Sequence, residues 1–242
     1  MNNSLFNNII KTSIPVLNNS GVIVSYAFII EFPVQNEKDK VIPFLVINYN
    51  DVRDLDKAIL AFNVLNNSVS GKYNVSFDQK FIQESHINDY VVHPIAGFLN
   101  DAISKGMKIE YLGLHENLIM NTDNQTTRSV ETLSYITYRN IGVGSDSFPV
   151  VNQTNNLTPF YGDNKDFFLM KGNANPCGYP VLVAEEGSFF NGNGLCLGSR
   201  VVFAGVAIRN VNDLVLVKYP KDLVDCIKSR FKNLFGSNKT NE

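Results

Sequence analysis

One cysteine of this chain lies in a tight turn that is bounded by two prolines and leads into an apolar run. The turn and the first residue of the run are Asn175-Pro176-Cys177-Gly178-Tyr179-Pro180-Val181. Proline restricts the backbone and glycine lets it turn sharply, so such a turn can hold a side chain on a rigid loop. A thiol held in this way suits nucleophilic catalysis once it is ionised. A lone cysteine is more often a small buried hydrophobic residue, and both interpretations stay open.

A cysteine nucleophile needs a base, and an imidazole is the usual one because it titrates near neutral pH. The chain has three histidines, His86, His93 and His115. His86 lies three residues before Asp89 and is the one that could approach Cys177. His93 shares a strand face with Asp89 by the period of two, which favours a core or interlobe position. His115 is expected in a surface turn.

The overall charge identifies no partner. Charged residues make up 18% of the chain and the net charge is -2, so no basic field is available for nucleic acid and no polybasic patch for a membrane. No apolar run reaches the ~18 residues of a membrane span, and the N-terminus does not resemble a secretory signal. We therefore expect a cytoplasmic protein that binds neither nucleic acid nor membrane.

The cysteines do not indicate a metal site or a disulfide framework. Their number is three, and Cys177, Cys196 and Cys226 never show C-x-x-C spacing. The glycine-rich stretch at residues 194–198 lacks the spacing of a phosphate-binding loop. We predict no cofactor and no metal.

Short apolar stretches separated by turn residues predict a mostly β protein in both halves. Strands are expected within residues 13–31 and at 41–47, 57–65, 73–81, 89–95, 130–139, 148–151, 166–170, 180–184, 201–208 and 214–217. A short helix is expected at residues 97–105, where apolar residues fall at helical spacing.

The polar, threonine-rich stretch at residues 121–128 is the best candidate for a boundary between two lobes. It divides the chain into residues 1–118 and 119–242. After Pro220, an apolar stripe of Leu223, Ile227, Phe231 and Leu234 ends before Gly236 and predicts an amphipathic terminal helix. We expect this helix to pack on the lobes rather than to bind a membrane or a partner.

The order of these features resembles that of bacterial trypsin-like peptidase domains. The turn at Cys177 is similar to their Gly-x-Ser-Gly-Ser-Pro-Val turn, with cysteine in place of serine as in viral 3C-type proteases. The strand at 45–50 and the stretch at 89–95 fall where that family has Leu-Val-Thr-Asn-x-His and Asp-x-Asp-Leu-Ala-x-x-Pro-Ile. The resemblance implies a chymotrypsin-like fold of two six-stranded antiparallel β-barrels, followed by the C-terminal helix.

Position by position, the resemblance implies that Cys177 matches the nucleophile, Asp89 the orienting acid and Asn50 the general base. An amide cannot act as that base. The substrate-binding positions fall on Asn175, Gly178 and Lys171. Asn175 would share the oxyanion hole with Cys177, although Pro176 restricts its backbone. Lys171 would select an acidic side chain, unless it is a solvated loop residue.

These substitutions favour a catalytically inactive pseudoprotease that binds a peptide or protein in the cleft between the lobes. An active cysteine endopeptidase that uses Cys177 is the first alternative. The second is a structural or oligomerisation domain in which the cleft is closed. The oligomeric state itself is not predicted by the sequence.

Overall fold

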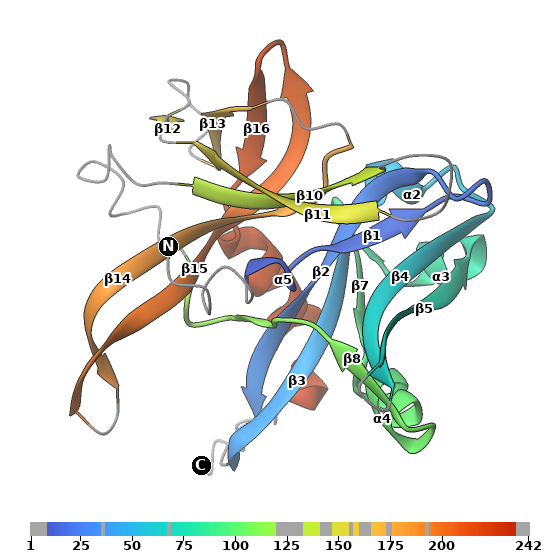
Figure 1. Ribbon diagram of the computed structural model, residues 1–242, viewed down its shortest axis with the longest axis horizontal. Coiled ribbons are helices and arrows are strands. Elements are labelled where there is room, and N and C mark those ends of the chain that lie inside the picture. The colour runs from blue at the N-terminus through green and yellow to red at the C-terminus, as the bar shows by residue number, and fades with distance from the viewer. Residues whose placement is uncertain are drawn as a thin grey trace, which may run out of the picture.

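A computed structural model describes most of the chain, namely residues 9–34, 37–66, 69–119, 133–140, 147–154, 157–159, 166–172, 176–191 and 194–235. The described residues form two sheets of mainly antiparallel strands, with a helix near the C-terminus (Figure 1). The prediction of a mostly β fold with a terminal helix is therefore confirmed.

The first sheet comes from the N-terminal half and has nine strands. The strands are β1 (Ile14–Leu17), β2 (Ile23–Val34), β3 (Glu37–Asn48), β4 (Lys57–Asn66), β5 (Val69–Asp78), β6 (His86–Ile87), β7 (Tyr90–Pro94), β8 (Met107–Glu110) and β9 (Leu114–His115). Their order is β5-β4-β1-β2-β3-β7-β6, with β8 beside β4 and β9 parallel to β2. The helices described along with this sheet are α2 (Tyr49–Val52), α3 (Gln79–Glu84) and α4 (Ala96–Ser104).

The second sheet comes from the C-terminal half and has seven strands in the order β11-β10-β14-β15-β16-β13-β12. The strands are β10 (Leu133–Asn140), β11 (Ser147–Thr154), β12 (Leu157–Pro159), β13 (Phe167–Lys171), β14 (Pro180–Asn191), β15 (Gly194–Val211) and β16 (Leu214–Lys218). Over the residues described, neither sheet closes into a barrel, and the strand numbers differ from the predicted six and six. Part of the excess is in β6, β9 and β12, because strands of two or three residues leave no periodic pattern in a sequence.

Strands β2 and β3 are buried on both faces and separate two hydrophobic cores. Phe28 and Ile30 on β2, together with Val46 on β3, belong to the core between the two sheets. Ala27 and Ile29, one residue out of phase, belong to a second core within the N-terminal half. Because side chains alternate along a strand, a continuously apolar run supplies both cores at once.

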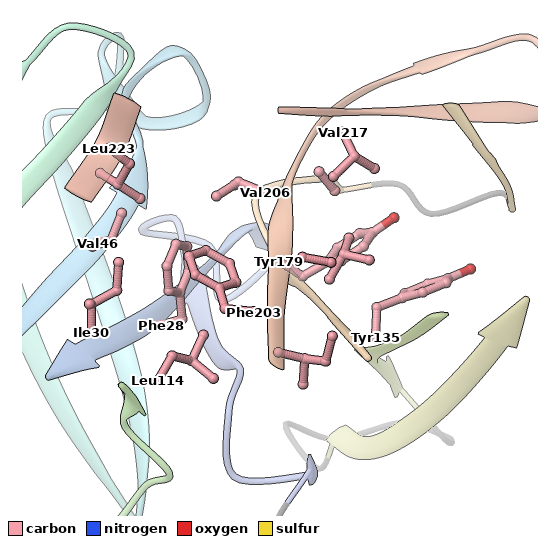
Figure 2. Close-up of a cluster of buried hydrophobic side chains, with 14 of the residues drawn as sticks. Phe28, Ile30, Val46, Leu114, Tyr135, Tyr179, Phe203, Val206, Val217 and Leu223 are labelled. Atoms are coloured by element: carbon pink, nitrogen blue, oxygen red, sulfur yellow. The ribbon is translucent and has the colours of Figure 1, made fainter. Parts of the chain in front are cut away.

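The core between the sheets contains residues from both halves of the chain. Figure 2 shows Phe28 of β2 beside Phe203 of β15, and the ring centroids of this pair are 5.4 Å apart. Leu114, from β9, belongs to the same cluster as Tyr179 and Val206 of the C-terminal half. The backbone also connects the halves, since Phe203 N donates a hydrogen bond to Leu118 O at 2.7 Å.

The terminal helix α5 (Lys221–Arg230) follows Pro220 and buries Leu223, Val224 and Ile227 in the core between the sheets. The prediction that it packs on the lobes is confirmed. Its last predicted apolar residue, Leu234, is instead exposed on the 3-10 turn η2 (Lys232–Leu234). The α-helix ends at Arg230, so helical spacing no longer applies beyond that residue.

Phe231 and Phe235 continue the contact that α5 begins. The Phe231 ring lies 4.9 Å from that of Phe44, and the Phe235 ring lies 5.2 Å from that of Phe32, measured between centroids. The C-terminal end of the described chain therefore returns to β2 and β3 of the N-terminal half.

Three predicted strands have clearly different ends in the structure. The strand predicted at 73–81 stops at Asp78, because the Asp78 carboxylate accepts a hydrogen bond from Phe81 N at 2.8 Å and caps α3. The strands predicted at 180–184 and 201–208 are longer, since β14 and β15 stay paired as far as Asn191 and Gly194. The predicted boundary loop at 121–128 lies outside the described residues.

Replacement of Phe28 tests the core between the sheets. Phe28 is fully buried, so Phe28→Ala should lower the free energy of unfolding by about 3–5 kcal/mol through lost contacts and a cavity. Ile103→Ala is the control, because Ile103 is 65% exposed and its loss should change stability by no more than about 0.5 kcal/mol. Urea denaturation measures both values, and equal losses would contradict the shared core.

Candidate functional site

The cysteine turn is fastened to the second sheet through its backbone. Gly178 N donates to Ala207 O at 2.8 Å, and Ala207 N donates to Tyr179 O at 3.1 Å. Gly178 has φ of +92°, a conformation that side chains other than hydrogen rarely allow. The turn is therefore rigid, as the sequence pattern indicates.

Gly178 also lies directly against the N-terminal half. A Cβ atom at this position would stand 2.3 Å from Ser25 Oγ on β2 and 3.2 Å from Asp51 Oδ2 on α2. The Cys177 carbonyl oxygen lies 3.5 Å from the same Ser25 hydroxyl. The turn is thus a contact point between the two halves of the chain.

The Cys177 side chain is enclosed by aromatic residues and is only 7% exposed. The Tyr135 and Tyr179 rings stack with centroids 4.7 Å apart, and Tyr26 meets Tyr179 edge-on at 5.9 Å. Burial raises the pKa of all three phenols, and their proximity to Cys177 raises it further. The thiol therefore lies in the core between the sheets.

Asp51 is a carboxyl that acts on this thiol. Ser25 Oγ donates a hydrogen bond to Asp51 Oδ2 at 2.7 Å. Burial raises the pKa of Asp51, although the bond from Ser25 lowers it in part. Burial, followed by the negative charge of Asp51, raises the pKa of Cys177 to about 12. The thiol is consequently protonated at neutral pH, and only a thiolate is an effective nucleophile.

The other two positions that match the triad have different surroundings. Asn50 is exposed on α2, and the neighbouring Asp51 is the α2 residue next to the cysteine turn. Asp89 Oδ2 accepts a salt bridge from Lys218 Nζ at 2.8 Å, and its backbone oxygen accepts a hydrogen bond from Tyr49 N at 2.8 Å. Asp89 thus joins β16 of the second sheet to α2 of the first half.

Each histidine makes its contacts with residues of the N-terminal half. The His86 ring stacks on Tyr49 with centroids 3.7 Å apart, and its Nε2 contacts Asn88 O. His93 is half-buried beside Phe81, with a centroid separation of 4.6 Å, and burial lowers its pKa. His115, the last residue of β9, accepts a hydrogen bond on Nδ1 from Asn117 N at 3.3 Å.

The predicted substrate-binding residues are placed as follows. Gly178 is buried in the turn, where its role is to allow close contact with Ser25. Lys171 is exposed at the end of β13, opposite Leu214 of β16. Asn175, the expected contributor to an oxyanion hole, lies outside the described residues.

The sequence analysis missed Ser25 and Asp51. Ser25 is fully buried, and a serine within the apolar run of β2 was a signal that a polar contact is made there. Asp51 is one residue beyond the position that matches the base. Only the helical turn α2 decides which of two consecutive side chains reaches Cys177.

Two further observations bear on the type of site. Among the described residues, no group of three or more His, Cys, Asp and Glu side chains is arranged to hold a metal ion. No described helix combines the length and the apolar composition required to cross a membrane.

Comparison with known proteins adds no assignment. No family model matches the chain, and a search of curated proteins finds no match either. The resemblance to trypsin-like peptidases accordingly stays a prediction from sequence.

The close approach at Gly178 makes a specific prediction. Gly178→Ala should lower the free energy of unfolding by about 1–3 kcal/mol from backbone strain alone, and further because Ser25 must move. Gly97→Ala is the matched control, since Gly97 lies in α4 with open space around it and alanine favours helix by about 1 kcal/mol. Opposite signs in urea denaturation are expected, and a neutral Gly178→Ala would contradict the contact.

The buried carboxyl of Asp51 predicts a dependence of stability on pH. Its pKa in the folded protein is raised above the ordinary 3.8, so the folded state holds a proton that the unfolded state has released. The contribution of Asp51 to the free energy of unfolding should therefore fall as the pH rises from the ordinary value through the raised one. Asp51→Asn should remove this part of the slope in urea denaturation at a series of pH values.

Asp54→Asn is the control for this experiment, because the Asp54 side chain is 85% exposed. It should retain the wild-type slope. If Asp51→Asn and wild type lose stability in parallel over this pH range, the carboxyl is not buried as described.

Proposed function

We propose that the chain is a non-catalytic protein of chymotrypsin-like architecture, a pseudoprotease that acts by binding a peptide or protein. Two sheets of mainly antiparallel strands, one from each half of the chain, support the architectural part of the proposal, although over the described residues neither sheet is closed. The main path of the first sheet contains β1 to β5 and β7, with β6 at its end and β8 and β9 paired off this path. With β12 set apart, the second retains β10, β11 and β13 to β16.

The observation that carries the proposal is the state of Cys177. Its thiol is 7% exposed, lies beside the carboxyl of Asp51 and has a pKa of about 12. A peptidase requires the opposite arrangement, in which the thiol is accessible and a neighbouring imidazole favours its ionisation. Here a carboxyl lies where a peptidase has that cation, and its charge disfavours the thiolate. Cys177 therefore lacks the ionised form that attacks a peptide bond.

A surface at the junction of the two halves supports binding in place of catalysis. It is formed by exposed Asn50, the stacked Tyr49 and His86, and the ion pair of Asp89 with Lys218. Flat aromatic groups beside hydrogen-bonding and charged groups suit recognition of a peptide. Through α2, this junction surface lies next to the cysteine turn. A peptide could bind it without access to the thiol.

The catalytic part of the proposal is tested with a fluorogenic peptide library. Wild type and Cys177→Ala should both leave the peptides uncleaved. Iodoacetamide should label Cys177 far more slowly in the folded protein than in urea, with the labelled residue located by mass spectrometry. Cleavage by wild type that Cys177→Ala abolishes would establish the alternative, an active cysteine endopeptidase.

The binding part is tested by selection from a displayed library of random peptides. Selected peptides should bind wild type and lose at least about tenfold in affinity on Asn50→Arg, equivalent to about 1.4 kcal/mol. Asn100→Arg, at an exposed position of α4, is the control and should bind as wild type does. Failure to enrich any peptide, or equal binding by both variants, would refute the proposed binding surface.

A further inference from the structure

A pocket lies where the segment after α5 packs against the end of β2. Its volume is about 260 Å³. Its lining comes from three separate stretches of the chain, namely the end of β2, the residue that follows β9, and the segment from α5 to just past η2. The lining residues are Phe32, Pro33, Glu116, Lys228, Lys232 and Phe235. None of them belongs to the junction surface, so this pocket is a separate site.

The apolar part of the lining is aromatic. Phe32 is 1% exposed, and the centroid of the Phe235 ring lies 5.2 Å from that of Phe32. Phe44, outside the lining, supports both rings, with centroids 5.4 Å from Phe32 and 5.9 Å from Phe235. Pro33, which is exposed, adds further apolar surface. An aromatic ring in this pocket would extend an existing cluster of ring contacts, and such contacts are favourable in offset or edge-on arrangements.

An ion pair occupies part of the polar lining. Lys228 Nζ pairs with the Glu116 carboxylate and also lies 5.9 Å from the centroid of the Phe32 ring. The Glu116 side chain is 11% exposed, so its charge requires a partner. Lys228 is therefore already engaged, and it serves to neutralise Glu116 rather than to bind a ligand.

Lys232 is the remaining cation of the pocket. It is exposed on η2, and across the part of the chain that the structure describes it forms no ion pair. Two lysines against one glutamate give the lining a net charge of +1 at neutral pH. A ligand with one negative charge would balance this lining, whereas a cation would be repelled by it.

The volume of the pocket limits the size of the ligand. An apolar cavity of about 150 Å³ is large enough to hold benzene. The pocket has about 260 Å³, which leaves room for one aromatic ring and a short acidic side chain. A small acid with one ring thus matches the pocket in size, in apolar surface and in charge.

We propose that this pocket binds a small monocarboxylate that carries a single aromatic ring. The ring packs against Phe32, Pro33 and Phe235, and the carboxylate pairs with Lys232, while the ion pair of Lys228 with Glu116 stays intact. The junction surface takes no part, so the proposal is independent of the proposed peptide binding.

Ligand-detected NMR with phenylacetate as the probe tests the proposal on the full chain. Wild type should bind it with a Kd on the order of 1 mM or tighter, as suits a ligand of this size. Acetate, which lacks the ring, should bind at least about tenfold more weakly. Phenylacetamide keeps the ring and the shape but lacks the charge, and it should bind at least about threefold more weakly.

Two variants locate the site. Lys232→Gln should weaken phenylacetate binding at least about threefold and leave phenylacetamide binding unchanged, because it removes only the charge. Phe235→Leu keeps an apolar side chain but loses the ring contact, so it should weaken binding of both ligands at least about twofold. Lys221→Gln, at an exposed position at the start of α5, is the charge-matched control and should bind as wild type does.

Circular dichroism of each variant separates a lost site from a lost fold, and the comparison of the three ligands on wild type does not depend on any variant. The proposal is overturned if wild type does not bind phenylacetate at millimolar concentration, or if phenylacetamide binds as tightly as phenylacetate. Equal binding of phenylacetate by wild type and Lys232→Gln, or by wild type and Phe235→Leu, would also overturn it.

Discussion

The arrangement of this protein depends on two central strands that are apolar on both faces. β2 and β3 supply Phe28, Ile30 and Val46 to the core between the sheets, and Ala27 and Ile29 to the core behind them. Since hydrophobic burial is the dominant favourable term in folding, neither core can be completed without these strands. The C-terminal helix, Phe231 and Phe235 pack against the same two strands. The end of the described chain therefore also depends on β2 and β3 for its position.

The same burial determines the chemistry of Cys177. A turn that must fit against Ser25 and Asp51 brings the thiol into a tyrosine-lined part of the core, where the carboxyl of Asp51 acts on it. Low local polarity favours the neutral form of each group, so burial raises both the pKa of the thiol and the pKa of the carboxyl. The packing that makes this turn a contact between the two halves also keeps the Cys177 thiol buried and protonated, and a protonated thiol is a poor nucleophile.

The exposed features lie on other parts of the molecule. The junction surface combines an aromatic pair with an interlobe ion pair, and Lys218 is the less exposed member of that pair, at 15% against 49% for Asp89. Asp89 therefore acts in this structure as a link between the two sheets, although the sequence resemblance gives it the role of an orienting acid.

Local sequence determined the elements whose signal lies in a few neighbouring residues. The apolar runs of β2 and β3, the helix near 97–105 and the start of the terminal helix after Pro220 were all predictable, because period and capping are local properties. The rigidity of the cysteine turn followed from Pro176, Gly178 and Pro180. Strands of two or three residues and the long β14–β15 hairpin were not predictable, because backbone pairing with a neighbour defines them.

Tertiary structure alone decided which polar groups meet, since Ser25 and Cys177 are 152 positions apart and no local pattern relates them. The resemblance in sequence pointed to Asn50, whereas in the structure Asn50 is exposed and the neighbouring Asp51 is the residue of α2 that lies beside the cysteine turn. A pKa depends on burial and on neighbours that the fold brings together, so the sequence determined that a thiol occupies this turn, and packing determined that it stays protonated.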